Sequence, residues 1–266
     1  MPTLLKAAVA GLLFAAAPAL ADSPFDGTWK ADLASQRVTA KPSRFEIRNG
    51  TFRCATCLPT AFAVPADGRF HRVAGRPYWD EVAVQPVDDH RVTLRFRKDG
   101  REVSTSTDTV AADGRTMTSV THNTNNGGNV PVDSTVTATR VGAPVAGAHL
   151  LSGAWQFAPE SAVSDAALTM TMRVEGDRFH QETGLGETLD ATIGGPYALN
   201  VNDPGRTMTK VERLGPRTLR FTDMSAGRVV GVSTFTVSDD GRTLTGSSRD
   251  PRTGNTSQFR AVKQEG

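Results

Sequence analysis

Two cysteines are the residues whose types and spacing point most directly to chemistry. They are the only cysteines among the 266 residues, and they form the motif Cys54-Ala55-Thr56-Cys57. Haem attachment requires a histidine directly after the second cysteine, but Leu58 stands there. Zinc with four protein ligands requires a second pair, which the chain lacks. A thioredoxin-like thiol pair begins a helix, whereas this pair lies among predicted strands. We therefore expect a local disulfide, with a redox pair as the alternative, and no cofactor or metal.

Other side chains that could do chemistry are scattered. The five histidines have no His-x-His or His-Glu-x-x-His spacing, so no two ring nitrogens are predicted to share a face. The Gly-x-Ser-x-Gly motif of many serine hydrolases is absent, and the acidic residues stand mostly in turn sequences, where aspartate has an ordinary structural role. The sequence therefore contains no recognisable catalytic apparatus, and we do not expect an enzyme.

The densest cluster of aromatic and charged residues is Arg76-Pro77-Tyr78-Trp79-Asp80. Aromatic side chains with a polar end are common in binding loops, which makes Tyr78 and Trp79 the candidate ligand-binding residues. The alternative is a capped, half-buried turn without a ligand.

Residues 1–21 resemble an export signal in their pattern. Lys6 precedes an apolar stretch, and Ala19-Leu20-Ala21 places small residues at the two positions that signal peptidase inspects. The stretch is shorter than the roughly 20 residues of a membrane-spanning helix. We expect cleavage after Ala21 and a periplasmic or secreted product without a transmembrane segment.

Charge narrows the set of partners. The formal net charge is +2, and removal of residues 1–21 would take away one lysine and no acid. The charged residues are dispersed without runs, so neither nucleic acid nor an acidic membrane surface is favoured as a partner. The remaining candidate partners are a small hydrophobic ligand and an envelope protein.

The same landmarks occur twice in the chain. They predict two tandem units, residues 22–143 and residues 148–266, joined by a short segment rich in small residues and proline. The paired landmarks are Gly27-Thr28-Trp29 with Gly153-Ala154-Trp155, Gly75-Arg76-Pro77-Tyr78 with Gly194-Gly195-Pro196-Tyr197, Thr93-Leu94-Arg95-Phe96 with Thr218-Leu219-Arg220-Phe221, and Asp113-Gly114-Arg115-Thr116 with Asp240-Gly241-Arg242-Thr243.

Each unit contains residue patterns that are typical of strands and tight turns. Alternation with a period of two runs through residues 229–237, and pairs such as Asn49-Gly50 and Asp99-Gly100 predict hairpin returns between short strands. An up-and-down antiparallel meander must close or stack to protect its edges. We therefore expect an all-β fold with two tandem antiparallel barrels, or strongly curved sheets, of about eight strands each.

The Gly-x-Trp motif, together with an arginine near the end of each unit, resembles the pattern of lipocalin-like (calycin) barrels. The resemblance implies a barrel floor in which the arginine lies across the indole, pairing Trp29 with Arg140 and Trp155 with Arg260. The chain also resembles secreted bacterial tandem-repeat β proteins whose function is not established, and which carry similar Gly-Thr-Trp-Lys, Pro-Tyr and Asp-Gly-Arg-Thr motifs.

Two functions follow from this fold. A barrel with an open mouth would bind a small apolar or amphipathic molecule, as lipocalin-like proteins do. A barrel filled by its own side chains would instead serve as a structural or protein-interaction module of the envelope. The fold alone does not decide between them.

Overall fold

The computed structural model describes residues 23–265, and the proposed signal peptide at residues 1–21 lies outside the described residues. These residues form an all-β protein with two antiparallel sheets of ten strands each and one short 3-10 helix, η1 (Asp165–Leu168). The predicted fold class is confirmed. Each sheet has two strands more than the eight expected, and several strands contain only three to five residues.

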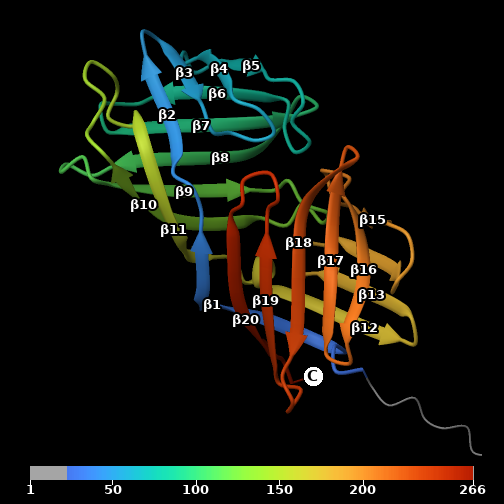
Figure 1. Cartoon of the computed structure of the whole chain (residues 1–266). Helices are drawn as coiled ribbons and strands as arrows, with labels where there is room; N and C mark the ends of the chain where they lie inside the picture. Colours follow the sequence, from blue (N-terminus) through green and yellow to red (C-terminus); the bar gives the residue numbers. More distant parts are fainter. Residues whose placement is uncertain (1–22, 266) are drawn as a thin grey trace, which may run out of the picture.

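One sheet is a closed barrel, and Figure 1 shows it below the other sheet. Its strands, in spatial order, are β1 (Gly27–Thr39), β12 (Thr169–Glu175), β13 (Arg178–Thr183), β14 (Thr188–Thr192), β15 (Ala198–Val201), β16 (Met208–Gly215), β17 (Thr218–Ser225), β18 (Arg228–Val237), β19 (Thr243–Arg249) and β20 (Thr256–Lys263). β20 pairs with β1 and completes the ring.

The other sheet, called here the open sheet, is nearly closed. Its spatial order is β4 (Phe62–Pro65), β3 (Thr51–Cys54), β2 (Ser43–Arg48), β11 (Gly153–Val163), β10 (Val132–Val141), β9 (Thr116–Asn123), β8 (Arg101–Val110), β7 (Arg91–Lys98), β6 (Glu81–Pro86) and β5 (Phe70–Arg72). β4 and β5 are its two edges. The equivalent strands of the closed barrel, β14 and β15, are joined by only two residue pairs.

The chain exchanges strands between the two sheets. β1 pairs with β12 and β20, so the first Gly-x-Trp strand completes the sheet built from the second half of the chain. β11 pairs with β10 and β2, so the second Gly-x-Trp strand completes the sheet built from the first half. Figure 1 shows the blue strand β1 next to the red strand β20. The expected boundary between residues 143 and 148 therefore does not divide the sheets, because β10 and β11 on either side of it pair with each other.

The hairpin turns are formed as their sequences predict. Asn49 and Gly50 both have positive φ, 49° and 70°, and they connect β2 to β3. Asp99 and Gly100 do the same between β7 and β8, with φ of 50° and 79°. Two consecutive residues with positive φ give the turn whose twist matches that of the flanking strands.

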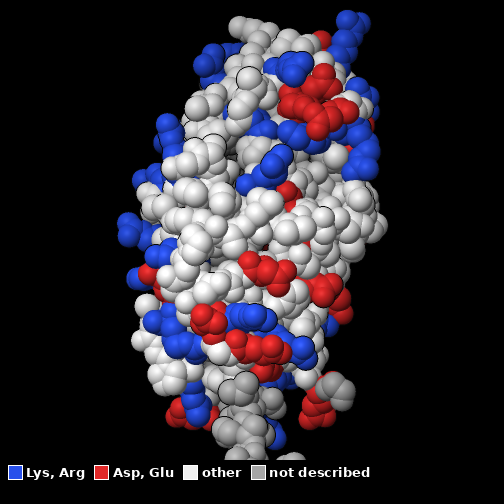
Figure 2. All heavy atoms as spheres, turned by 90° about the vertical axis from the view of Figure 1, so that its right-hand side faces the viewer, with Lys and Arg blue, Asp and Glu red and all other residues white. Residues whose placement is uncertain are grey.

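Each sheet encloses its own hydrophobic core. Trp155, Phe52 and Val84 are among the buried residues inside the open sheet. Trp29 and Phe179 belong to the corresponding core of the closed barrel. On the face shown in Figure 2, basic and acidic side chains are interspersed. None of the helices in the part of the chain that the structure describes is long and apolar enough to span a bilayer.

Candidate functional site

The two tryptophans of the Gly-x-Trp motifs lie at one end of each core. Both side chains are fully buried, and each indole nitrogen donates a hydrogen bond to a carbonyl four residues earlier: Trp29 to Phe25 at 2.9 Å and Trp155 to Leu151 at 2.8 Å. The two indoles therefore have equivalent surroundings in the two sheets.

The cations that cover these indoles differ from the predicted pairs. Arg140 lies over Trp155, with its guanidinium carbon 4.2 Å from the ring centroid, because β10 pairs with β11. Lys263 is the residue paired with Trp29, and its ammonium lies 5.4 Å from that ring. Arg260 is exposed and pairs with Asp32. The predicted pairs Trp29 with Arg140 and Trp155 with Arg260 are thus corrected to Trp29 with Lys263 and Trp155 with Arg140.

The glycine of each Gly-x-Trp motif makes room for the cation. A Cβ atom on Gly153 would lie 2.6 Å from Nη1 of Arg140, and one on Gly27 would lie 2.6 Å from Cε of Lys263. Both glycines also have φ in the region that favours glycine, 141° and 120°. The glycine of the motif therefore has a structural role, since it allows the cation to approach the indole.

The Cys-x-x-Cys pair forms the expected disulfide between Cys54, at the end of β3, and Cys57. Arg76 contacts the loop that follows this disulfide, since its guanidinium donates hydrogen bonds to the carbonyls of Leu58 and Thr60. The disulfide and Arg76 together hold this loop against the open sheet.

Tyr78 and Trp79, the two predicted ligand-binding residues, each line a separate large cavity, and both also line a smaller one of about 200 Å³. Trp79 packs against Phe62 and Phe96 inside the open sheet. Tyr78 reaches out of the open sheet to the mouth of the closed barrel, where its ring lies over Gly205. A Cβ atom on Gly205 would overlap this ring, so the close approach requires glycine.

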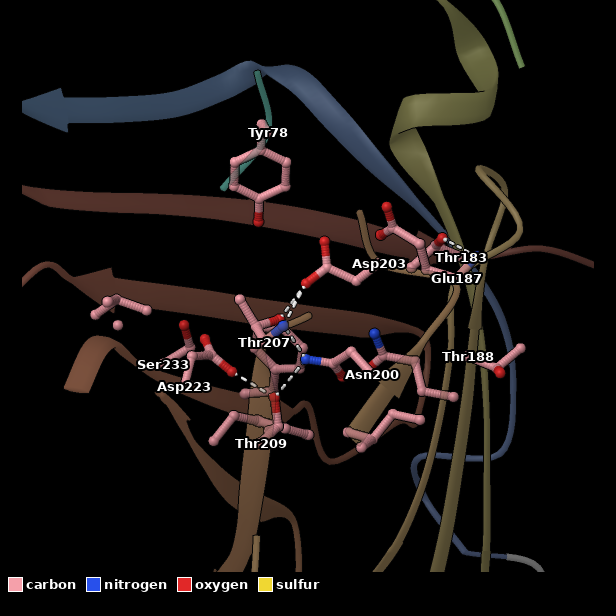
Figure 3. Close-up of a pocket in the computed structure, with 16 residues that line it drawn as sticks. Tyr78, Thr183, Glu187, Thr188, Asn200, Asp203, Thr207, Thr209, Asp223 and Ser233 are labelled. Carbon is pink, nitrogen blue, oxygen red and sulfur yellow. Dashed lines mark hydrogen bonds between the residues drawn. The ribbon is translucent and has the colours of Figure 1, made fainter. Parts of the chain in front are cut away.

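The cavity beneath Tyr78 has a volume of about 390 Å³ (Figure 3). Its apolar part includes Phe221 and Phe235, whose rings lie 4.9 Å apart. Three carboxylates, those of Glu187, Asp203 and Asp223, line it as well, and none of its 16 lining residues is basic. The closed barrel thus holds a cavity with an aromatic part and an acidic part.

A chain of hydrogen bonds fixes two of these carboxylates. The Asn200 amide donates to the hydroxyls of Thr207 and Thr209, at 2.8 and 3.0 Å. Each hydroxyl in turn donates to a carboxylate: Thr207 to Asp203 at 2.5 Å and Thr209 to Asp223 at 2.6 Å. Because each threonine uses its proton on a carboxylate, Asp203 and Asp223 are positioned as acceptors.

The environment disfavours negative charge at this site. Burial raises the pKa of Glu187 and of Asp223, and the neighbouring Asp203 carboxylate raises both pKa values further. Burial and the carboxylates of Asp203 and Glu187 also raise the pKa of Tyr78, which keeps its phenol protonated. Figure 3 shows this hydroxyl pointing toward Asp203. The mouth therefore carries acidic groups whose charge no side chain of the cavity offsets.

Sequence reasoning missed Glu187, Asp203 and Asp223, because it assigned acidic residues mainly to turns. One signal was present. Leu219, Phe221 and Asp223 alternate along β17, so Asp223 falls on the same inward face as the two apolar residues. Glu187 and Asp203 lie between strands, and no local pattern in the sequence aims them at a common cavity.

Three histidines each contact an aspartate: His71 with Asp67, His122 with Asp133, and His180 with Asp190. Within residues 23–265, no group of three or more His, Cys, Asp or Glu side chains is arranged to hold a metal ion.

Comparison with known proteins gives no relative from which a role could be transferred, since no protein-family model matches the chain and no curated protein matches it.

Proposed function

We propose that the chain is a lipocalin-like binding protein for a small amphipathic molecule, and that the ligand occupies the closed barrel. Its apolar body would lie against Phe221 and Phe235, and a positively charged group would lie at the mouth among Glu187, Asp203 and Asp223. The observation that carries this proposal is the unfilled cavity of about 390 Å³ in which carboxylates are present and basic side chains are absent.

The electrostatics of the mouth favour a cationic group. An ammonium among carboxylates forms charge-assisted hydrogen bonds, which are roughly twice as strong as neutral ones. The pKa values of Glu187 and Asp223 are raised by burial and then by the Asp203 carboxylate, and a cation would offset that repulsion. The Tyr78 hydroxyl, which points toward Asp203, adds a polar group at the mouth (Figure 3).

Gly231 keeps the acidic part of the cavity open. This residue lies on β18 opposite Asp223, and a Cβ atom there would approach the Asp223 carboxylate to 3.1 Å. A side chain at this position would stand between the carboxylate and a ligand, whereas glycine leaves the Oδ2 atom of Asp223 accessible.

Export is also part of the proposal. Residues 1–21 have the composition of a signal peptide, so the binding protein would act in the periplasm or outside the cell. A disulfide is compatible with such an oxidising compartment.

Three ligands with the same aromatic body test the proposal. Calorimetric titration should show that 2-phenylethylamine binds at least tenfold more tightly than 2-phenylethanol, and that 3-phenylpropanoate does not bind. Asp223→Asn keeps the hydrogen bond from Thr209 but removes the charge, so it should weaken amine binding about tenfold, or about 1.4 kcal/mol.

Asp239→Asn is the matched control, since this aspartate is fully exposed outside the cavity, and amine binding should not change. A protein-interaction module without a ligand would bind none of the three molecules. Equal affinity for the amine and the alcohol would contradict a cationic ligand.

The pH dependence follows from the raised pKa values of Glu187 and Asp223. As the pH falls, these groups take up protons before ordinary carboxyl groups do, while an alkylamine stays charged. Amine affinity should therefore decrease on acidification, beginning above the usual carboxyl range. In Asp223→Asn this decrease should be smaller.

The raised pKa of Asp223 lowers the stability of the ligand-free protein at neutral pH, although its charge favours amine binding. A raised folded-state pKa means that the folded protein loses stability as the pH rises through that pKa. Asp223→Asn should therefore raise the melting temperature of the ligand-free protein at neutral pH, while it weakens amine binding. A lower melting temperature in thermal unfolding would show that the Asp223 charge is compensated within the protein.

A further inference from the structure

The open sheet contains a second cavity, of about 370 Å³, with a different lining. Aromatic rings dominate its wall: Trp79 lies 5.5 Å from Phe62 and 5.1 Å from Phe96, measured between ring centroids. Phe45 and Phe157 also line the cavity and pack edge to face, with an interplanar angle of 84°. Such a wall favours a flat aromatic occupant, because rings gain from stacked and edge-on contacts.

Arg76 forms part of this lining and has an unused hydrogen-bond donor. Its side chain is buried, with 5% of the residue exposed, and its guanidinium carbon lies 5.0 Å from the ring of Phe62 and 5.3 Å from that of Trp79. The two terminal nitrogens donate to backbone carbonyls, but Nε has no partner. A buried donor that is left unpaired is unfavourable, so an acceptor atom brought by an occupant would be stabilised here.

Asp108 provides a second polar group in the same cavity. Ser106 donates to its carboxylate at 3.4 Å, and Ser106 also contacts Ser119 at 3.1 Å. Burial raises the pKa of Asp108. These groups offer a hydrogen-bonding site at the side of the cavity formed by β8 and β9.

The equivalent position in the closed barrel carries an aromatic ring. Asp108 pairs with Ser119, two residues from the pair Val110 with Met117. Phe235 pairs with Gly246, two residues from the pair Val237 with Leu244. At equivalent positions, β8 of the open sheet therefore carries the polar Asp108 and β18 of the closed barrel carries the aromatic Phe235. The two cavities thus suit different molecules.

We propose that the cavity of the open sheet is a second binding site, which takes an uncharged planar aromatic molecule with a hydrogen-bond acceptor for Arg76 and a donor for Asp108. One cation and one acid line this cavity, so an occupant needs no net charge. The site is independent of the amine site proposed in the closed barrel.

The fluorescent probe 7-aminocoumarin has the required chemistry, with a carbonyl at one end of a planar ring system and an amino group at the other. Its fluorescence titration should show saturable binding to the full-length protein. Coumarin lacks the amino group and should compete about tenfold less well. Absence of saturable binding would overturn the proposal.

Two variants at equivalent positions locate the probe. Ser106 and Ser233 are four residues before Val110 and Val237, and each lines the cavity of its own sheet. Ser106→Phe should fill the open-sheet cavity and weaken 7-aminocoumarin binding more than tenfold, while Ser233→Phe should leave it unchanged. The reverse pattern would place the probe in the closed barrel and overturn the assignment.

Trp79 gives a readout that does not depend on a cavity-filling change. Excitation of tryptophan should sensitise emission from bound 7-aminocoumarin, because Trp79 lines the cavity wall, whereas Trp155 does not line the cavity and Trp29 belongs to the core of the closed barrel. Trp79→Phe should reduce the sensitised emission per bound probe, with the amount of bound probe measured by direct excitation of 7-aminocoumarin. Unchanged sensitised emission would contradict the site. The amine titration on the same variants tests the closed barrel separately.

Discussion

Arg140 connects three segments at the floor of the open sheet. Its Nε donates to the Gly114 carbonyl at 2.5 Å and its Nη1 to the Ser152 carbonyl at 2.6 Å, while Nη2 donates to the carbonyl of Leu150. The guanidinium therefore stacks on Trp155 and also satisfies three backbone carbonyls.

Removal of Arg140 should be strongly destabilising. Arg140→Ala leaves these carbonyls unpaired and uncovers the Trp155 ring, for an expected loss of about 3 kcal/mol in the free energy of unfolding. Arg260→Ala, at the position that sequence comparison equated with Arg140, should change it by no more than about 0.5 kcal/mol, because this residue is exposed. Urea unfolding of both variants measures the difference, and similar losses would contradict the assigned floor.

At the scale of elements, the loop from Gly75 to Asp80 contributes side chains to the cavities of both sheets. Arg76 and Trp79 face the open-sheet cavity, while Tyr78 faces the closed barrel. The backbone of this loop is held at Tyr78, whose carbonyl accepts a hydrogen bond from the Asn125 amide at 2.5 Å. Neighbouring residues of one loop thus line both proposed sites.

The contact between Tyr78 and Gly205 can be tested by a double-mutant cycle. Gly205→Ala should destabilise the protein by about 1–3 kcal/mol, because the added methyl group overlaps the Tyr78 ring. In a Tyr78→Ala background the same change should be neutral or slightly stabilising, since alanine restricts the unfolded chain more than glycine does. Thermal or urea unfolding of the four proteins gives the coupling. Equal effects in both backgrounds would show that Tyr78 does not occupy the mouth.

Local features were predictable from the sequence, but strand partners were not. Asn49-Gly50 and Asp99-Gly100 specify hairpins through their own backbone preferences. The strand that Trp29 joins depends on residues more than 100 positions away, and both sheets offer a similar edge. Since the two Gly-x-Trp motifs are alike, sequence symmetry permits either pairing, and only the assembled sheets distinguish Arg140 from Lys263 as the partner of Trp29.

At the scale of the whole molecule, the sequence predicts some residues of the cavities but not the contacts between the two sheets. Phe221 and Phe235 could be expected inside a barrel from their alternation. The meeting of Tyr78 with Asp203 could not, because one residue belongs to the open sheet and the other to the closed barrel. A backbone hydrogen bond from Gly128 to Leu185, at 2.7 Å, also connects the two sheets.

Strand exchange changes the division of the chain into folding units. The ten strands of the open sheet lie between residues 43 and 163 without interruption, so residues 40–164 form a continuous unit inserted after β1. The closed barrel is discontinuous, because it combines β1 with β12 to β20. In both sheets the Gly-x-Trp strand occupies the equivalent place, since β11 lies between β10 and β2 and β1 lies between β20 and β12.

Fragments of the chain should fold accordingly. Residues 40–164 should unfold cooperatively and give dispersed amide signals in NMR, because every strand of the open sheet and its Trp155 floor are retained. Residues 22–143 lack β11 and contain β1 without either partner, so they should remain unfolded. A stable fragment 22–143 together with an unfolded fragment 40–164 would contradict the exchanged topology.

A permuted barrel supplies the matching test for the other sheet. Trp29 pairs with Lys263, and the Gln264 amide donates to the Thr28 carbonyl at 2.8 Å, so the end of β20 lies beside the start of β1. A short glycine linker from residue 265 to residue 24 would therefore form a hairpin between these antiparallel strands. The permuted fragment then consists of residues 165–265, the linker and residues 24–39, and we expect it to fold. It should bind 2-phenylethylamine more weakly than the whole protein, because Tyr78 is missing. The same fragment without residues 24–39 should not fold, since it loses Phe25 and Trp29 from the core.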